Sequence, residues 1–161
     1  MEKRTQATSR RSQLQSAPDD LRRVIVRFAD GSILRGYFAP EDSESLRDDS
    51  SGTFGVRRVD GEVEHVQLDS IKAVFFVKTF EGSRQYSEFK VFTNQPNGRG
   101  VWIRVHFHDG EIMEGIASNS LDTYTRPVFS LTPPDPRSNN ESVLVSKQCL
   151  KEMQILGLAS D

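Results

Sequence analysis

The chain has 161 residues, a net charge of −2 and 35% hydrophobic residues, enough for one large domain or two small ones. A charge this close to zero gives no reason to expect general affinity for polyanions, and the single cysteine, Cys149, excludes an internal disulfide framework. No stretch approaches the roughly 18 apolar residues of a membrane span, and the N-terminus lacks a hydrophobic signal segment. We therefore expect a cytoplasmic protein that does not associate with a membrane.

Residues 1–20 are polar and contain only two large apolar side chains, Met1 and Leu14. They cannot bury enough surface to offset the entropy of ordering, so we expect a disordered basic arm. Up to residue 23 the chain has six lysines and arginines against three acidic residues. Such a segment is either a solubilising tail or a contact for nucleic acid, a nucleotide or an acidic partner. The candidate contact residues here and in the following strand are Arg10, Arg11, Arg22, Arg23 and Arg27.

Residues 24–36 and 103–115 share one pattern. In each, an alternating apolar strand runs into Asp-Gly, and a second strand reaches another glycine five residues after the first. The offset is constant (109 − 30 = 79), and the matching pairs are Val26 and Val105, Phe28 and Phe107, Asp30 and Asp109, Gly31 and Gly110, Ile33 and Ile112, Gly36 and Gly115. Asp-Gly between alternating strands predicts a β-hairpin with a two-residue type I′ turn, in which both central residues have positive φ.

The rest of the first copy reads as short strands joined by polar turns. Residues 40–52 form an acidic loop without the alternating ligands of a calcium loop. Strands are expected at 53–58 and, after a second Asp-Gly, at 62–68, followed by one helical turn at 69–72. Residues 73–77 are apolar throughout, which predicts a strand covered on both faces.

The second copy follows a connector at 81–100 that contains breaker-rich segments and an extra strand at 86–93. The expected elements after it are a hairpin at 101–118, a loop at 119–126, a strand at 127–131, a proline-rich loop at 132–140, a strand at 142–146 and a last strand with Met153, Ile155 and Leu156. Each copy thus has five short strands. The predicted fold is all-β, with two tandem five-stranded small barrels at 21–80 and 101–161. Gly36 and Gly115 are expected to serve the curvature of these sheets.

This order of elements resembles the Sm-like barrel and the related SH3-like barrels, over residues 21–80 and 100–157. Residues 71–82, Ile-Lys-Ala-Val-Phe-Phe-Val-Lys-Thr-Phe-Glu-Gly, are also similar to a segment of an uncharacterised bacterial protein family. The Sm resemblance implies ring assembly and RNA binding through two loops. It also implies that a tandem pair could place the last strand of one barrel against the fourth strand of the other. Such pairing would explain why residues 73–77 are apolar throughout.

The chain departs from the Sm pattern at the RNA-binding positions. Leu121–Tyr124 resembles the Asp-containing RNA loop, but Arg126 replaces the asparagine that contacts the base. The Arg-Gly pair of the other loop is absent, and Ser146-Lys147 stands nearest to its position. A second nucleotide hypothesis comes from Arg23-x-x-x-Arg27, which matches the first half of the PilZ pattern for cyclic dinucleotides. The second half of that pattern is one residue short in residues 48–52.

The outward face of the second hairpin is the candidate partner-binding surface. It consists of Trp102, Arg104, His106 and His108, and tryptophan and arginine are enriched at binding hot spots. The alternative is that the 78–100 connector covers Trp102. The two histidines could share a zinc ion with one further ligand, but a site needs three or four, so we expect no metal.

No catalytic motif accompanies these features. The sequence has no Gly-x-Ser-x-Gly elbow, no His-Glu-x-x-His and no phosphate loop, and Cys149 is read as a small core residue rather than a thiol activated by Lys147 and Lys151. We therefore expect no enzyme and no cofactor. The predicted function is a non-catalytic binding or adaptor module for proteins, acting through the Trp102 face or by strand addition at sheet edges. The alternative is RNA or cyclic dinucleotide binding, and a homo-oligomer stays open.

Overall fold

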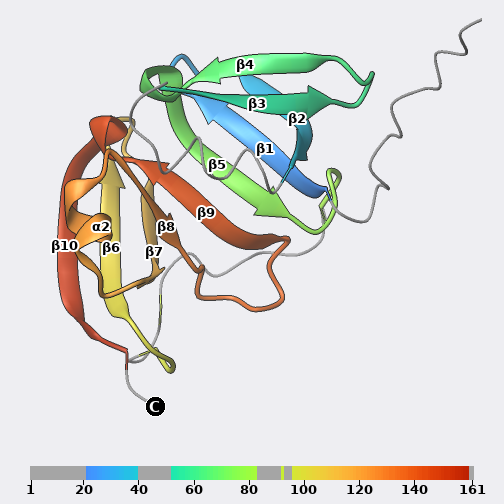
Figure 1. The fold of residues 1–161 in the computed structure, drawn as a ribbon. Coiled ribbons are helices and arrows are strands. Elements are labelled where there is room, and N and C mark those ends of the chain that lie inside the picture. The colour runs from blue at the N-terminus through green and yellow to red at the C-terminus, as the bar shows by residue number, and fades with distance from the viewer. Residues whose placement is uncertain (1–20, 40–51, 83–91, 93–95, 160–161) are drawn as a thin grey trace, which may run out of the picture.

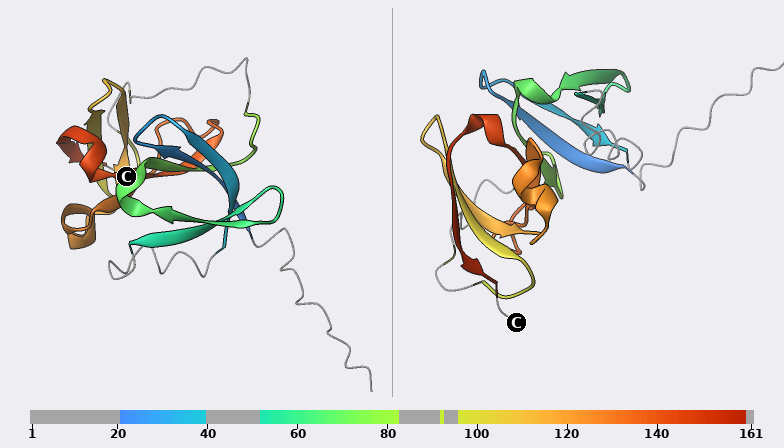
Figure 2. Two further views of the ribbon diagram at one scale, coloured as in Figure 1. Left: turned by 90° about the horizontal axis from the view of Figure 1, so that it is seen from above. Right: turned by 60° about the vertical axis from the view of Figure 1, so that its left-hand side comes forward.

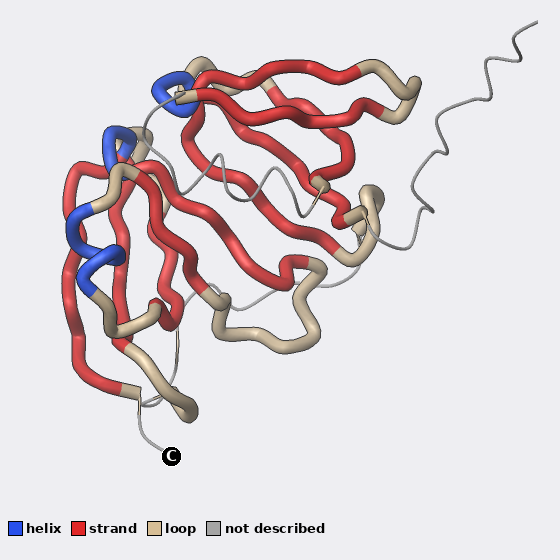
Figure 3. The backbone as a smooth tube through the Cα atoms, viewed as in Figure 1, coloured by secondary structure: helices blue, strands red, loops and turns tan. Residues whose placement is uncertain are grey.

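The computed structural model describes residues 21–39, 52–82, 92 and 96–159. These residues form an all-β structure of two sheets, and Figure 3 shows that most of the described backbone is strand. The larger sheet has seven strands in the order β4-β3-β2-β1-β5-β9-β8, and the smaller has three in the order β10-β6-β7. Figures 1 and 2 show the smaller sheet beside the β8–β9 end of the larger one.

Three predictions fall on the remaining segments. The arm at 1–20, nearly all of the acidic loop at 40–52 and all but one residue of the connector strand at 86–93 lie outside the described residues.

Both halves contain five strands with a short helical turn before the fifth, as the sequence predicts. The first half has β1 (Arg22–Phe28), β2 (Ile33–Phe38), β3 (Thr53–Arg58), β4 (Val63–Gln67), η2 (Leu68–Ser70) and β5 (Ile71–Val77). The second half has β6 (Val101–Phe107), β7 (Ile112–Ala117), α2 (Leu121–Thr125), β8 (Val128–Leu131), β9 (Asn140–Ser146), η3 (Lys147–Cys149) and β10 (Leu150–Leu158).

The helix α2 corrects the predicted loop at 119–126. Arg126 N donates to Asp122 O at 3.0 Å across this turn, and two side-chain hydroxyls also bond within the segment: Thr123 Oγ1 donates to Ser118 O at 2.7 Å and Thr125 Oγ1 donates to Leu121 O at 3.0 Å. With five residues, the helix is too short to show the apolar periodicity that sequence analysis looks for.

The Asp-Gly turns are hairpin turns, but not of the predicted type I′. Gly31 N donates to Phe28 O at 3.1 Å and Phe28 N donates to Ser32 O at 2.9 Å, and Gly31 is the residue with positive φ. Among the described residues no non-glycine has positive φ, so Asp30 adopts an ordinary conformation. This is the three-residue loop in which glycine forms a bulge. Asp30 Oδ1 accepts from Ser32 N at 2.8 Å, which caps the loop.

The same hydrogen bonds recur in the other two Asp-Gly turns. Gly61 and Gly110 donate to Arg58 O and Phe107 O, at 3.0 Å in both cases. The carboxylates of Asp60 and Asp109 accept from the backbone N–H two residues later, at 3.1 and 3.0 Å. One local rule therefore forms all three hairpins.

Gly36 and Gly115 are sites of close backbone approach, as expected for curved sheets. A Cβ on Gly36 would lie 2.5 Å from Arg57 O, and one on Gly115 would lie 2.8 Å from Thr132 O. Neither gap admits a methyl group without backbone movement. The absence of a side chain thus lets the second strand of each half bend over the third.

Neither sheet closes into a barrel among the described residues. In the first half β4 pairs with β3 alone, and β5 uses its second edge for β9 of the other half. In the second half, β7 meets the following segment through a single bridge, Ile116 with Thr132, with N···O distances of 3.0 and 2.9 Å. The strands predicted to form two closed barrels therefore form two open sheets, because the halves share strand pairing with each other.

The junction between β5 and β9 confirms the predicted pairing of a last strand with a fourth strand. The antiparallel register aligns Ala73 with Val145 and Phe76 with Ser142. Every residue from 73 to 77 is buried, as their continuous apolar character predicted.

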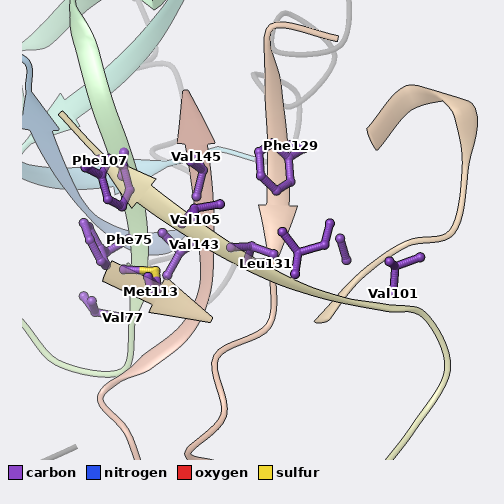
Figure 4. Packing of buried hydrophobic residues seen from close by; sticks show 13 residues of the cluster. Phe75, Val77, Val101, Val105, Phe107, Met113, Phe129, Leu131, Val143 and Val145 are labelled. Carbon is purple, nitrogen blue, oxygen red and sulfur yellow. The ribbon is translucent and has the colours of Figure 1, made fainter. Parts of the chain in front are cut away.

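Alternate residues of β5 enter two different cores. Val74 and Phe76 pack in the core of the first half, and Ala73, Phe75 and Val77 pack in that of the second. Figure 4 shows Phe75 and Val77 near Met113 of β7, with Phe107 of β6 and Val143 of β9 close by. One strand thus contributes to both interiors, which ties the halves together.

Candidate functional site

An ion-pair cluster lies at the start of β5, where the first half meets the β6–β7 turn. Lys72 Nζ lies 2.5 Å from both Asp109 Oδ2 and Glu111 Oε2, and 4.5 Å from the centre of the Phe107 ring. Arg27 Nη1 lies 3.5 Å from Glu111 Oε2. Burial alone would lower the pKa of Lys72, but the two carboxylates outweigh it, so the pKa lies above its usual value. The hydrogen bond from Lys72 lowers the pKa of Asp109.

The helical turns η2 and η3 also meet at this junction. Gln148 Nε2 donates to Leu68 O at 3.4 Å and to Asp69 O, and Cys149 Sγ lies 3.5 Å from Ile71 O. Burial raises the pKa of the Cys149 thiol above its ordinary value. Cys149 is partly buried and packs against the core of the second half.

In the repeat, β5 of the first half corresponds to β10 of the second half, and β9 of the second half corresponds to β4 of the first. Both β10 and β4 are edge strands. Figure 1 shows β4 along the top of the molecule and β10 along its left side. Among the described residues no strand pairs with the outer edge of either one. Val63 on β4 is 51% exposed and Ile155 on β10 is 56% exposed. Edges with exposed apolar side chains and unpaired backbone groups are templates for a further strand.

The predicted Trp102 surface is organised around a buried carboxylate. Glu114 is fully buried, and its Oε1 accepts from Arg104 Nε and Nη2 at 2.8 and 2.6 Å. Its Oε2 accepts from Trp102 Nε1 at 3.1 Å and from Phe92 N at 2.8 Å. The Phe92 ring packs edge-on against Trp102 with centroids 6.0 Å apart. Phe92 belongs to the connector. This residue therefore agrees with the alternative interpretation of the sequence, in which the connector covers Trp102.

The other two residues of that surface are separated from this cluster. His108 is exposed in the β6–β7 turn, and His106 is half-buried with no hydrogen-bond partner at Nε2. In the described part of the chain, no three histidine, cysteine or acidic side chains form a metal-binding group. A partner-binding role for Trp102, Arg104, His106 and His108 stays a prediction.

Sequence reasoning missed Glu114, because the predicted two-residue turn would pair it with Val105. The three-residue loop of the structure places Glu114 directly opposite Arg104. Opposite charges at facing positions of an antiparallel pair indicate an ion pair. The burial of Glu114 could not be predicted, because the segment that covers it is distant in sequence.

The arginines of the predicted nucleic-acid contact have separate protein partners. Arg22 Nη2 lies 3.5 Å from Glu141 Oε2, and its guanidinium stacks 4.2 Å from the Phe76 ring. Arg23 Nη1 donates to Lys78 O at 3.2 Å. Arg27 belongs to the junction cluster. Arg10 and Arg11 lie outside the described residues, so the contact as a whole stays a prediction.

A groove of about 820 Å³ lies between the first half and the α2–β8 segment. Phe38 and Phe76 are among its apolar lining residues, and Arg22 and Arg126 are among its charged ones. Both arginines face acidic groups; Arg126 Nε lies 3.4 Å from Asp122 Oδ2. The groove has mixed polarity, with no accumulation of one charge.

These observations define a two-sheet all-β protein, built on a repeated Asp-Gly hairpin, with open sheet edges. The family described as "Family of unknown function (DUF6982)" matches residues 20–157, and the chain belongs to this family. The match agrees with the expected likeness to an uncharacterised family. No curated protein and no solved structure matches the chain. In the part of the chain that the structure describes, no helix is long and apolar enough to cross a bilayer.

Proposed function

We propose that the protein is a non-catalytic interaction module that binds protein partners by strand addition at the open edges of β4 and β10. The observation that carries this proposal is the β5–β9 junction. There the edge strand of the first half pairs with a strand of the second half, and the two form one continuous sheet. Main-chain hydrogen bonds supply the affinity in such pairing, and alternate side chains supply the specificity.

The strand order also supports a finer assignment of the fold. The first half runs β5-β1-β2-β3-β4, and the second runs β10-β6-β7 and then, across the Ile116–Thr132 bridge, β8-β9. The two orders are equivalent. We assign each half to a small unit of Sm-like or SH3-like type, in a bacterial cytoplasmic protein.

The edges are better binding candidates than the Trp102 surface. Trp102 and Arg104 already satisfy their donors on Glu114, so a partner would compete with these hydrogen bonds. Val63 and Ile155 are exposed, and a partner strand would remove their apolar surface from water at no such cost.

RNA or cyclic dinucleotide binding is the second candidate. The groove favours it, because Arg22 and Arg126 line a cavity large enough for a small ligand. The acidic partners of both arginines weaken the attraction for phosphate. This candidate therefore ranks below strand addition.

Affinity capture from native lysate tests the two candidates together. The tagged full chain is compared with Val63→Lys and Ile155→Lys, and Leu121→Lys on α2 is the matched control for an exposed apolar residue. We expect a defined protein on the wild type and the control, and its loss from at least one edge variant. Nucleic acid on all four proteins, released as salt rises, would instead support the second candidate.

A further inference from the structure

We propose that the protein at each open edge is a second copy of this chain, with β10 of one copy pairing antiparallel with β4 of the next. The inference rests on the proposed function, since it requires that these edges accept strands. It goes further in naming the partner and the register. The internal β5–β9 junction provides the template for the junction between copies.

The repeat maps one junction onto the other. With the offset of 79, β5 corresponds to β10 and β9 corresponds to β4. Their surroundings match over most of their length. Against β1, the register of β5 shifts between Phe28 and Arg27, and against β6, that of β10 shifts at the same place, between Leu150 and Glu152. The two strands therefore pair in the same way as far as Ile155, and β10 then has a second shift, between Ile155 and Gly157, that β5 lacks.

Transfer of the internal register brings the exposed apolar side chains together. In the junction Phe76 stands opposite Ser142, and the equivalent positions are Ile155 and Val63. Both are exposed apolar residues of the two edges, where β10 also has the exposed Leu158. Pairing in this register would cover each with the other, as neighbours across an antiparallel pair do. A slip by one residue would place Ile155 and Val63 on opposite faces of the joined sheet.

The ion pair of the junction has a counterpart of the same kind. Lys72 and Asp109 correspond to Lys151 and Asp30, and Lys151 is exposed. In both turns Oδ1 of the aspartate accepts the backbone N–H two residues later. In the β6–β7 turn Oδ2 then receives Lys72. In the next copy, Asp30 would present Oδ2 to Lys151 in the same way.

Such a contact is head-to-tail, because β4 and β10 are different surfaces. Each added copy leaves one β4 edge and one β10 edge open, so assembly continues until a ring closes or a filament forms. A two-fold dimer is not expected from this contact.

Light scattering and sedimentation of the full chain over a range of concentrations test the proposal. We expect the wild type and the Leu121→Lys control to form assemblies of more than two copies. Val63→Lys and Ile155→Lys would each bury a lysine in the contact, and each alone should weaken self-association by at least about thirtyfold.

A mixture of the two edge variants is the decisive measurement. Val63→Lys keeps an intact β10 edge and Ile155→Lys keeps an intact β4 edge. Mixed together, they should form a one-to-one dimer that neither forms alone and that does not grow further. Circular dichroism is the control that each variant is folded.

A smaller effect tests the ion pair. Asp30→Asn keeps an oxygen for the turn and removes the charge, and it should weaken assembly by about two- to fivefold at low salt. Asp122→Asn on α2, which also removes an exposed aspartate charge, should leave assembly unchanged.

A wild type that stays monomeric at all concentrations overturns the proposal. Self-association that is unchanged by both Val63→Lys and Ile155→Lys also overturns it. If a foreign protein is then still captured through Val63 or Ile155, strand addition as the function stands. If neither assembly nor capture depends on the edges, the proposed function fails as well.

Discussion

The hairpins β1–β2 and β6–β7 have the same turn and apolar inward residues at equivalent positions, but their outward residues differ. Val24 and Val26 are fully buried, as are Ile103 and Val105 at the equivalent positions. On the other face, Arg35 of β2 is exposed, whereas Glu114 at the equivalent position of β7 is fully buried.

The difference arises from what covers each outward face. Phe92 of the connector lies on Trp102 and donates its N–H to Glu114, so that face is removed from water. A buried carboxylate must be paired, and Arg104 supplies the charge. The repeat thus determines the interior of each half, and the covering segment determines its outer chemistry.

The largest effect is expected where the two hairpins differ most. Glu114→Ala leaves the donors of Arg104 and Trp102 without an acceptor and should lower the free energy of unfolding by about 3 kcal/mol. Arg35→Ala is the control at the equivalent position, and as a surface change it should stay within about 0.5 kcal/mol. Urea denaturation measures both. Equal losses would show that the hairpins do not differ in this way.

The same substitution has an optical signature. Trp102 is the only tryptophan in the chain. Glu114→Gln keeps one acceptor oxygen but loses the charge that holds Arg104, so the Trp102 emission should shift to the red as the Phe92 contact loosens. Arg35→Gln should leave the spectrum unchanged, and a shift there would mean that Trp102 reports general loosening.

The next effect tests what the hairpins share. Gly36→Ala places a methyl group against Arg57 O, and Gly115→Ala places one against Thr132 O. Each should cost about 1–3 kcal/mol, the usual range for overpacking. Gly157→Ala on β10, where a Cβ meets nothing within 4 Å, is the matched control. A cost at one site only would break the equivalence of the two halves.

Local and repeated features of the fold could be predicted from the sequence. The alternation around Asp30 and Asp109 placed both hairpins, and the apolar run at 73–77 indicated a strand covered on both sides. These predictions depend on residues close in sequence, or on a repeat that compares the chain with itself. The pairing of β5 with β9 followed from the resemblance and the apolar run together.

Features set by distant segments could not be predicted. The turn type, although local, could not be predicted either, because Asp-Gly suits both a two-residue type I′ turn and a three-residue loop with a glycine bulge. The closed barrels were predicted because five strands suit closure, but β5 pairs with β9 instead. The buried state of Glu114 depends on Phe92, which no local pattern places.

A smaller effect separates the two equivalent lysines. Lys72→Met removes the donor to Asp109 and Glu111 and should lower the free energy of unfolding by about 1–2 kcal/mol. Lys151→Met at the equivalent exposed position should be near neutral in dilute protein, where copies are separate. Equal effects in urea denaturation would mean that the Lys72 cluster adds nothing to stability.

The smallest effect concerns the pH dependence of the two turn aspartates. The pKa of Asp109 is lowered by the hydrogen bond from Lys72 and then by that from the Glu111 N–H, and the pKa of Asp30 is lowered by Ser32. A carboxyl with a lowered folded-state pKa contributes stability that is complete above its unfolded value, near 3.8. That stability is lost as the pH falls through the folded-state pKa. Because Asp109 is half-exposed, Asp109→Asn should cost only about 0.5–1 kcal/mol at pH 7.

The cost of Asp109→Asn should shrink towards zero as the pH falls below the folded-state pKa, since the wild-type carboxyl is then neutral as well. Among the described residues of one copy Asp30 has no lysine partner, so Asp30→Asn should cost less than Asp109→Asn at pH 7 in dilute protein. Urea midpoints between pH 7 and pH 2.5 measure both curves. A cost for Asp109→Asn that stays constant with pH would mean that the turn hydrogen bond, and not the charge facing Lys72, distinguishes the second hairpin from the first.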